Sequence, residues 1–135
     1  MRTLVVWAPP RQDSFSHRVL TTAVAALRRA GHHVDVLDLY GEDYRPAMSP
    51  REWRAYSELR AEPDPTTAAH IALVQAAEQL VFIYPTWWFG LPAILKGWME
   101  RTLVPTVAFR LDDKGALRGN LLVQRIVGIS TYGSA

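Results

Sequence analysis

The sequence lacks three features that would each point to a particular class of protein. It contains no cysteine, which excludes disulfide bridges and thiolate metal sites. No window approaches the ~18 consecutive apolar residues that a membrane-spanning helix needs. The formal net charge is only +2, and Lys and Arg are mixed with Asp and Glu. Because no basic stripe or apolar span is present, we expect a cytoplasmic protein that neither binds nucleic acid nor inserts into a membrane.

The 135 residues, of which 49% are hydrophobic, suffice for one domain with a packed core but not for two. We therefore expect residues 1–135 to form a single domain. The apolar run at the N-terminus is too short for the core of a signal peptide and is typical of a first strand. The four histidines have no partners at metal-ligand spacing, and Asp112-Asp113 resembles a turn, so no metal site is expected.

Apolar runs and helical periodicities alternate along the chain. The runs predict buried strands, and the periodic segments between them predict helices that cross over from one strand to the next. This alternation is typical of an α/β fold with a doubly wound parallel sheet. The predicted strands are residues 3–8, 33–40, 80–84 and 121–129. The predicted helices are residues 14–30, 51–60, 66–79 and 92–103, and residues 104–120 are predicted to form a long connection.

Three consecutive aromatic residues, Trp87, Trp88 and Phe89, follow the third predicted strand. Pro85 ends that strand because it has no N–H to donate, and Pro92 suits the first position of the next helix. The aromatic residues therefore lie on a strand-to-helix loop, at the sheet edge where open α/β sheets bind ligands. Two interpretations remain: the aromatic side chains pack under a subunit interface, or they offer a flat apolar face to a planar ligand.

The residues around this loop form a longer motif. A proline and a short spacer precede Trp-Phe-Gly, one apolar residue follows, and then come Pro-Ala-Ile-Leu-Lys-Gly-Trp and the pair Glu100-Arg101. This stretch resembles the NAD(P)H:quinone oxidoreductase family of flavodoxin-like flavoproteins. The resemblance implies a flavodoxin-like sheet of order 2-1-3-4-5. The fifth strand is expected to be missing from this chain, which would be C-terminally short.

The resemblance also implies an activity and its cofactors. The family binds FAD or FMN non-covalently, and NAD(P)H is the co-substrate. A nicotinamide donates hydride to the flavin N5, leaves, and is replaced by a quinone or a similar small-molecule electron acceptor. The resemblance further implies a homodimer with the site at the subunit boundary. The tyrosine and histidine that assist hydride transfer in the family would lie beyond Ala135, so no catalytic residue is assigned.

The flavin contacts that the resemblance implies come from three loops. Pro85, Thr86, Trp87, Trp88 and Phe89 would form one wall, with loop amides at the flavin N5 and pyrimidine edge. In the first loop, the Ser-Phe-Ser segment would wrap the phosphate, although hydroxyl residues at a helix start are also ordinary caps. This segment consists of Ser14, Phe15 and Ser16.

The first loop departs from the family at one position. The family carries a histidine where this chain has Pro9, which offers neither a donor nor a charge. Arg11 is the candidate to take over the phosphate contact.

The end of the fourth strand supplies the third loop. Thr131, Tyr132, Gly133 and Ser134 match a Thr-Tyr-Gly-Ser segment that lines the flavin in the family, although small hydroxyl residues are also typical of a plain turn. Phe109 matches an aromatic run that reaches over the active site of the dimer partner. It is therefore a candidate substrate-binding lid, or alternatively a core aromatic under a loop.

Two alternatives to the enzyme follow from the same resemblance. Some relatives are regulatory flavoprotein subunits of a membrane transporter, for which the partner contact matters as much as turnover. A degenerate flavin-binding protein without activity is the other alternative. The observations that favour it are Pro9 in place of the histidine and the absent C-terminal motif.

Overall fold

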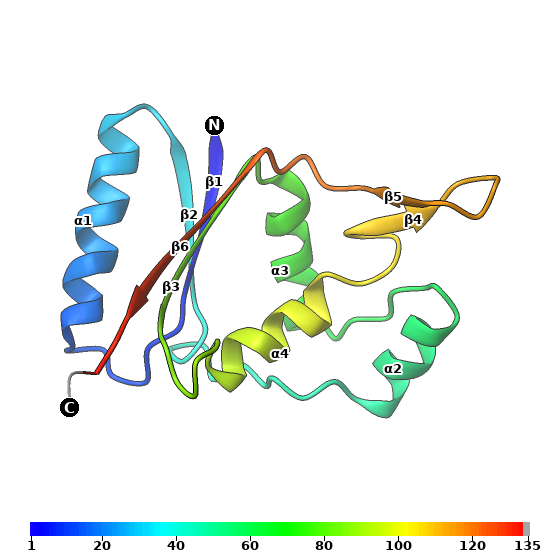
Figure 1. Cartoon of the computed structure of the whole chain (residues 1–135), viewed down its shortest axis with the longest axis horizontal. Coiled ribbons are helices and arrows are strands. Elements are labelled where there is room, and N and C mark those ends of the chain that lie inside the picture. The colour runs from blue at the N-terminus through cyan, green and yellow to red at the C-terminus, as the bar shows by residue number, and fades with distance from the viewer. Residues whose placement is uncertain (134–135) are drawn as a thin grey trace.

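The computed structural model describes residues 1–133, which form a four-stranded parallel sheet with helices on both faces and a separate hairpin (Figure 1). The elements in chain order are β1 (Arg2–Trp7), α1 (Phe15–Arg29), β2 (His33–Asp38), α2 (Pro50–Ser57), α3 (Pro65–Ala76), β3 (Gln79–Pro85), α4 (Ala93–Thr102), β4 (Phe109–Leu111), β5 (Leu117–Gly119) and β6 (Arg125–Thr131).

The main sheet has the order β2-β1-β3-β6, and every neighbouring pair is parallel. Its four strands thus occupy the first four positions of the order 2-1-3-4-5, which confirms the predicted flavodoxin-like topology. None of the described residues pairs with the outer edge of β6. The predicted Ser134 contact lies outside the described residues.

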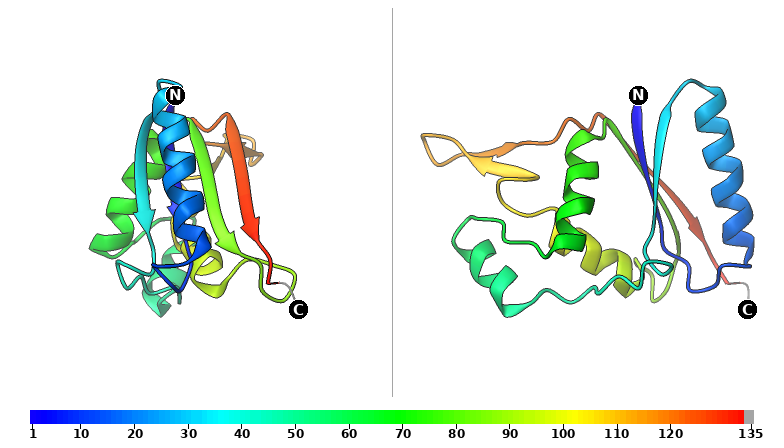
Figure 2. Two further views of the ribbon diagram at one scale, coloured as in Figure 1. Left: turned by 90° about the vertical axis from the view of Figure 1, so that its left-hand side faces the viewer. Right: turned by 180° about the vertical axis from the view of Figure 1, so that it is seen from behind.

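The sheet lies between α1 on one face and α3 and α4 on the other (Figure 2), and an apolar layer fills the space on each side. On one face, Leu80 and Phe82 of β3 pack with Val74 of α3 and Trp98 of α4. On the other face, Val81 and the residues around it pack against α1. Because successive side chains of a strand point to opposite faces, a strand with both faces covered must be apolar throughout, which explains the unbroken run in β3.

Helix boundaries agree with the sequence prediction to within a few residues. Gly31 ends α1 as predicted: its φ of +86° suits glycine, and its N–H donates to the Arg28 carbonyl at 3.0 Å. Pro92 is the N-cap of α4 rather than its first helical residue. In α2 the capping box between Ser49 and Glu52 fixes the start of the helix.

Two predictions about the C-terminal third are wrong. Residues 104–120 are not a plain connection, because β4 and β5 form an antiparallel hairpin there, closed by Asp112 accepting from the N–H groups of Lys114 and Ala116. Three-residue strands are too short to give a periodicity signal. The fourth sheet strand begins at Arg125 rather than 121 and extends to Thr131, since its ladder with β3 continues to Pro85.

Candidate ligand site at the carboxyl edge of the sheet

The three predicted flavin-binding loops leave the sheet at one edge, the lower edge in Figure 1. They follow β1, β3 and β6, whose carboxyl ends point the same way because the strands are parallel. The Thr86 N–H donates to the Thr131 carbonyl at 2.8 Å and ties the second loop to the third. The structure therefore gathers the predicted loops around the β1–β3 switch point, where this fold class binds ligands.

The aromatic loop forms a tight turn with unusual backbone geometry. Trp87 and Gly90 exchange two backbone hydrogen bonds, of 3.2 and 3.1 Å, across the turn. The two central residues, Trp88 and Phe89, have φ of +50° and +60°. Turns with positive φ at both central positions strongly favour Asn-Gly. Bulky L-residues in this conformation cost about 1–2 kcal/mol each, so the turn is strained.

The same two aromatic side chains are open to solvent. Trp88 is 95% exposed and Phe89 is 100% exposed, whereas Trp87 is 44% exposed. Neither strain nor exposed apolar area stabilises the free protein. A ligand with a flat apolar face would cover both rings, and strained backbone at such a position is typical of a ligand-binding segment. Within one chain Trp88 and Phe89 are not part of the core, and their exposure is compatible with both interpretations, a ligand wall and a subunit interface.

The first loop presents the N-terminus of α1 at the same edge. The Ser14 hydroxyl donates to the Arg11 carbonyl at 3.0 Å and does not cap the helix. No acidic residue occupies the first turn, so its free N–H groups remain suited to an anion. Phe15 is 71% exposed and could cover part of a ligand.

Two residues of this loop are less available than the sequence suggested. The Ser16 side chain is buried and its oxygen accepts a hydrogen bond from Trp7 Nε1 at 2.9 Å. Arg11 pairs with Asp13 at 3.1 Å. This hydrogen bond, with the attraction between the charges, raises the pKa of Arg11 and lowers the pKa of Asp13. Asp13 thus offsets the positive charge that a phosphate would meet at Arg11. Pro9 is buried.

The third loop adds a phenol beside the aromatic turn. Tyr132 is 75% exposed. Hydrogen bonding with the Ser130 side chain, and to a smaller extent with the Thr86 side chain, lowers the pKa of the Tyr132 hydroxyl. Gly133 follows without a side chain, so the backbone here is open to close approach.

The structure does not bring Phe109 to this edge within one chain. It lies on β4, on the far side of α4 from α1 and from the last described residue (Figures 1 and 2). Its ring is half-buried and packs edge-on against Tyr56, with 6.4 Å between the ring centroids and an interplanar angle of 66°.

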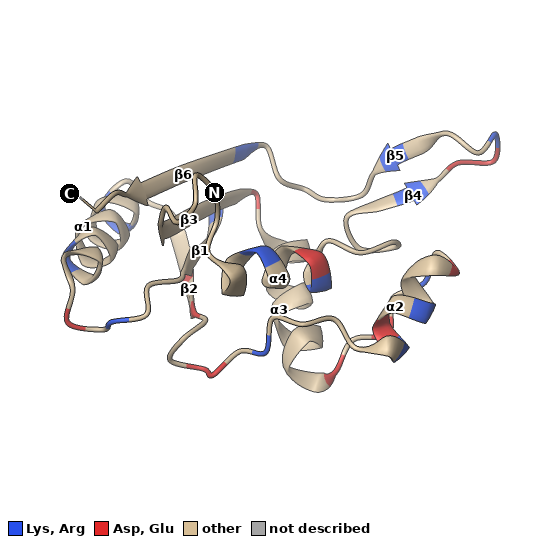
Figure 3. Cartoon of the chain, turned by 60° about the horizontal axis from the view of Figure 1, so that its bottom comes forward, with Lys and Arg blue, Asp and Glu red and all other residues tan. Residues whose placement is uncertain are grey.

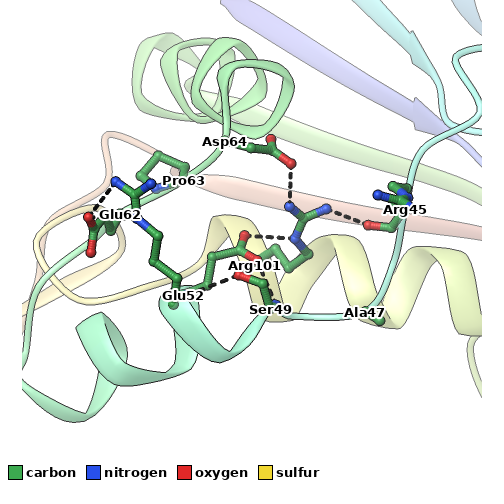
Figure 4. Close-up of a pocket in the computed structure, with 9 residues that line it drawn as sticks. Arg45, Ala47, Ser49, Glu52, Glu62, Pro63, Asp64 and Arg101 are labelled. Carbon is green, nitrogen blue, oxygen red and sulfur yellow. Dashed lines mark hydrogen bonds and ion pairs between the residues drawn. The ribbon is translucent and has the colours of Figure 1, made fainter.

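An ionic cluster around Arg101 was missed by the sequence analysis (Figure 4). The buried guanidinium donates to Glu52 at 2.8 Å, to Asp64 at 2.7 Å and to the Arg45 carbonyl, and it stacks on the Tyr44 ring. Burial alone would lower the pKa of Arg101, but the bonds to the two carboxylates outweigh it and the pKa is raised. Arg101 therefore locks α4 onto α2 and the start of α3.

The cavity beside this cluster, of about 360 Å³, has charged walls whose charges are largely matched. It is best explained as part of the framework that holds α4, and so the aromatic turn, in place. The sequence contains a signal for this buried arginine. Arg101 falls on the buried stripe of its helix, three residues after Trp98 and seven after Ile94.

Neither a metal-binding cluster nor a membrane-spanning helix is found in the described part of the chain. Residues 1–133 contain no group of His, Asp and Glu side chains arranged to hold a metal ion. No helix within the described part of the chain has the length and apolar character needed to cross a membrane.

Comparison with known families and proteins agrees with the architecture. The family model described as flavodoxin-like fold matches residues 1–135, and the chain belongs to that family. Rat NAD(P)H dehydrogenase [quinone] 1 is 33% identical over 153 residues, covering 98% of this chain and 54% of the relative. Human ribosyldihydronicotinamide dehydrogenase [quinone] is 30% identical, covering 99% of this chain and 64% of the relative.

A solved protein structure shares this fold. The NAD(P)H:quinone oxidoreductase from Methanothermobacter marburgensis superposes with a TM-score of 0.86 at 28% identity, covering 100% of this chain and 65% of that protein. The chain thus spans about half to two-thirds of the length of these relatives.

Proposed function

We propose that this chain is an NAD(P)H-dependent flavin oxidoreductase that passes hydride from NAD(P)H, through bound FAD or FMN, to a quinone or a similar acceptor. The observation that carries the proposal is the Trp88–Phe89 turn, strained and fully exposed at the carboxyl edge of the sheet. The similarity to proteins named as NAD(P)H and ribosyldihydronicotinamide quinone dehydrogenases supports it. We assign the protein to the cytoplasm.

In this proposal each of the three loops contacts a different part of the flavin. The aromatic loop, from Pro85 through Thr86 and Trp87 to the turn, forms the wall against the ring system. The first turn of α1, with Ser14, Phe15 and the Ser16 backbone, receives the phosphate, while Thr131, Tyr132 and Gly133 close the third side. The bound flavin would supply the hydride chemistry, and the chain would orient it and exclude water from the ring.

The proposal includes a homodimer. Phe109 lies away from the loops of its own chain, so it would meet the acceptor only at the site of a partner subunit. Sedimentation of the flavin-loaded chain as a dimer would support this part, and a monomer would contradict it without affecting flavin binding.

The test is a titration of the purified chain with FAD and FMN, followed by anaerobic addition of NADH or NADPH. We expect one flavin to bind, its absorbance to bleach with a nicotinamide, and the colour to return with a quinone. Trp88→Ala should weaken flavin binding, with the exposed Trp53→Gln on α2 as the matched control. A chain that binds neither flavin would refute the proposal.

A flavin-binding protein without turnover is the second candidate. The buried Pro9 and the Arg11–Asp13 pair favour it, because both weaken the charge available to the phosphate. Flavin that binds but is not bleached by either nicotinamide would favour this candidate over the enzyme.

A further inference from the structure

His70 is a buried imidazole that does not belong to any of the three loops at the carboxyl edge. It lies in α3 and is only 3% exposed. Helix α3 packs beside α4, the helix that follows the aromatic loop (Figures 1 and 3). Because a buried polar group without a partner is destabilising, each ring nitrogen of His70 requires a hydrogen bond.

The two ring nitrogens of His70 contact different elements. Nε2 lies 2.7 Å from the carboxylate of Glu42, in the loop that joins β2 to α2. Nδ1 accepts from the indole N–H of Trp98 on α4, at 3.3 Å. An indole N–H can only donate, and an ionised carboxylate can only accept. Both contacts are therefore satisfied together only by a neutral imidazole that carries its proton on Nε2.

Glu42 and Trp98 favour different protonation states of His70. The negative charge of Glu42 favours the imidazolium form. Trp98 is fully buried, so a proton on Nδ1 would place two donors face to face and leave the indole N–H without an acceptor. Protonation of His70 would thus strengthen its pairing with the loop after β2 and remove its hydrogen bond to α4.

The other groups around His70 do not supply a second charge to the ring. Helix α3 carries no other titratable side chain, and Glu42 is the only ion-pair partner of His70 within residues 1–133. The ring packs at a tilt on Tyr44, with 5.2 Å between the centroids, and burial raises the pKa of the Tyr44 hydroxyl, which keeps it neutral. Beyond Tyr44, the charge of Arg101 is balanced by two carboxylates, those of Glu52 and Asp64.

The contacts of His70 connect two of the loops proposed to hold the flavin. Through Trp98 it reaches α4 and so the aromatic loop. On the other side, the Glu42 N–H donates to the Asp38 carbonyl at 2.9 Å. The Gln12 amide of the first loop donates to the Asp38 carboxylate at 3.4 Å. A change at His70 can therefore be transmitted to both loops through groups in direct contact.

We propose that His70 is a positioning residue for the flavin site. As the neutral Nε2–H tautomer it holds α4 and the loop after β2 in the arrangement that binds flavin, and its protonation releases α4. Acid would then weaken flavin binding through a residue outside the three flavin loops. This effect on flavin rests on the proposed function, whereas the tautomer and the contact with Trp98 are properties of the flavin-free chain.

The first test uses NMR of the flavin-free chain between about pH 7.5 and about pH 5.5, the range in which histidine changes charge. Ring ¹⁵N shifts should place the His70 proton on Nε2 at the higher pH, and the Trp98 indole signal should move as His70 takes up a second proton. In Glu42→Gln this movement should begin at lower pH, because the amide still accepts from Nε2 but lacks the charge. The matched control is Asp43→Asn, which removes the same charge from the exposed next residue and should leave the movement unchanged.

The second test measures FAD and FMN affinity over the same pH range. The loss of affinity in acid should be about fivefold larger in the parent chain than in His70→Gln, because glutamine can accept from Trp98 and donate to Glu42 at every pH. Comparison with this variant cancels the titration of the flavin phosphate and of the other histidines. His70→Leu, which can make neither contact, should bind flavin weakly at both ends of the range.

Three results would overturn the proposal: a His70 proton on Nδ1 at the higher pH, a Trp98 indole signal that does not follow the protonation of His70, or equal losses of flavin affinity in the parent chain and in His70→Gln. The first two need no variant, so they decide the matter even where His70→Leu does not fold. Failure of the flavin proposal gives a different pattern. In that case neither FAD nor FMN binds, while the Trp98 signal still follows His70.

Discussion

At the scale of single residues, the Trp88–Phe89 turn has a conformation that lowers the stability of the free protein and that we expect to favour ligand binding. Both residues adopt the left-handed region, where a Cβ atom is unfavourable, and both expose their rings. The turn persists because Thr86 anchors it on β6 and α4 follows directly after it. Relief of the strain should therefore separate the stability of the free protein from its affinity for a ligand.

We predict that Phe89→Gly raises the free energy of unfolding of the flavin-free chain by about 1 kcal/mol, because glycine adopts positive φ without a steric cost. The same change should lower flavin affinity, since a ring that covers the ligand is lost. Urea unfolding and flavin titration measure the two effects. Trp53→Gln, at an exposed helical aromatic, should change neither, and a destabilised Phe89→Gly variant would contradict the assignment of strain to this turn.

At the scale of elements, the position of α4 decides where the aromatic turn lies. Arg101 fixes one end of the helix to α2 and α3. Near its middle, Gly97 lets the loop before α2 approach so closely that an added Cβ would lie 2.2 Å from the Pro46 carbonyl oxygen. A helical glycine usually costs about 1 kcal/mol relative to alanine, so its presence here is explained by the contact and not by helix propensity.

We predict that Gly97→Ala lowers the free energy of unfolding by about 1–3 kcal/mol, because the clash with Pro46 outweighs the gain in helix propensity. The matched control is Gly128→Ala in β6, where the added Cβ would meet the Tyr84 hydroxyl at an ordinary 3.6 Å. This control should be as stable as the parent chain or more stable. Equal stability of the Gly97→Ala and Gly128→Ala variants in denaturant would show that the Pro46 loop moves aside freely.

At the scale of the whole molecule, several paired carboxylates govern the response to acid. Burial alone would raise the pKa of Asp64, but bonds from the Thr67 N–H and from Arg101 outweigh it, so the pKa lies below its ordinary value of 3.8. Hydrogen bonds from Arg51 and from the hairpin backbone likewise lower the pKa of Glu62 and of Asp112. Each carboxylate therefore contributes stability that is fully present above its unfolded pKa and is lost as the pH falls through its folded pKa.

We predict a free energy of unfolding that is nearly constant between pH 7 and about 5 and falls below about pH 4, as these carboxylates become protonated. Asp64→Asn keeps an N-cap acceptor for α3 but removes the charge, so its decline between about pH 5 and 2 should be shallower. Denaturant melts at several pH values measure this slope. An unchanged slope in Asp64→Asn would mean that Asp64 is not a source of the acid sensitivity.

The sequence alone determined the sheet and the position of its main loops. Unbroken apolar strands, helices with periodic faces and Gly31 at a helix end are local signals, so the parallel sheet and the carboxyl-edge location of Trp87, Trp88 and Phe89 could be predicted from them. The strand order was predicted from the resemblance to the flavodoxin-like family. The β4–β5 hairpin carries no such signal, because its three-residue strands are held by Asp112 and by neighbouring chain segments.

The tertiary structure alone decided which groups face one another. The turn with positive φ at Trp88 and Phe89 is tied through Thr86 to β6, which is distant in sequence, and the partners of Arg101 come from three other segments. The inward turn of Ser16 onto Trp7, and the separation of Phe109 from the flavin loops, are likewise set by packing. Composition and periodicity carry no information on such pairings, since they depend on the close approach of residues that are far apart along the chain.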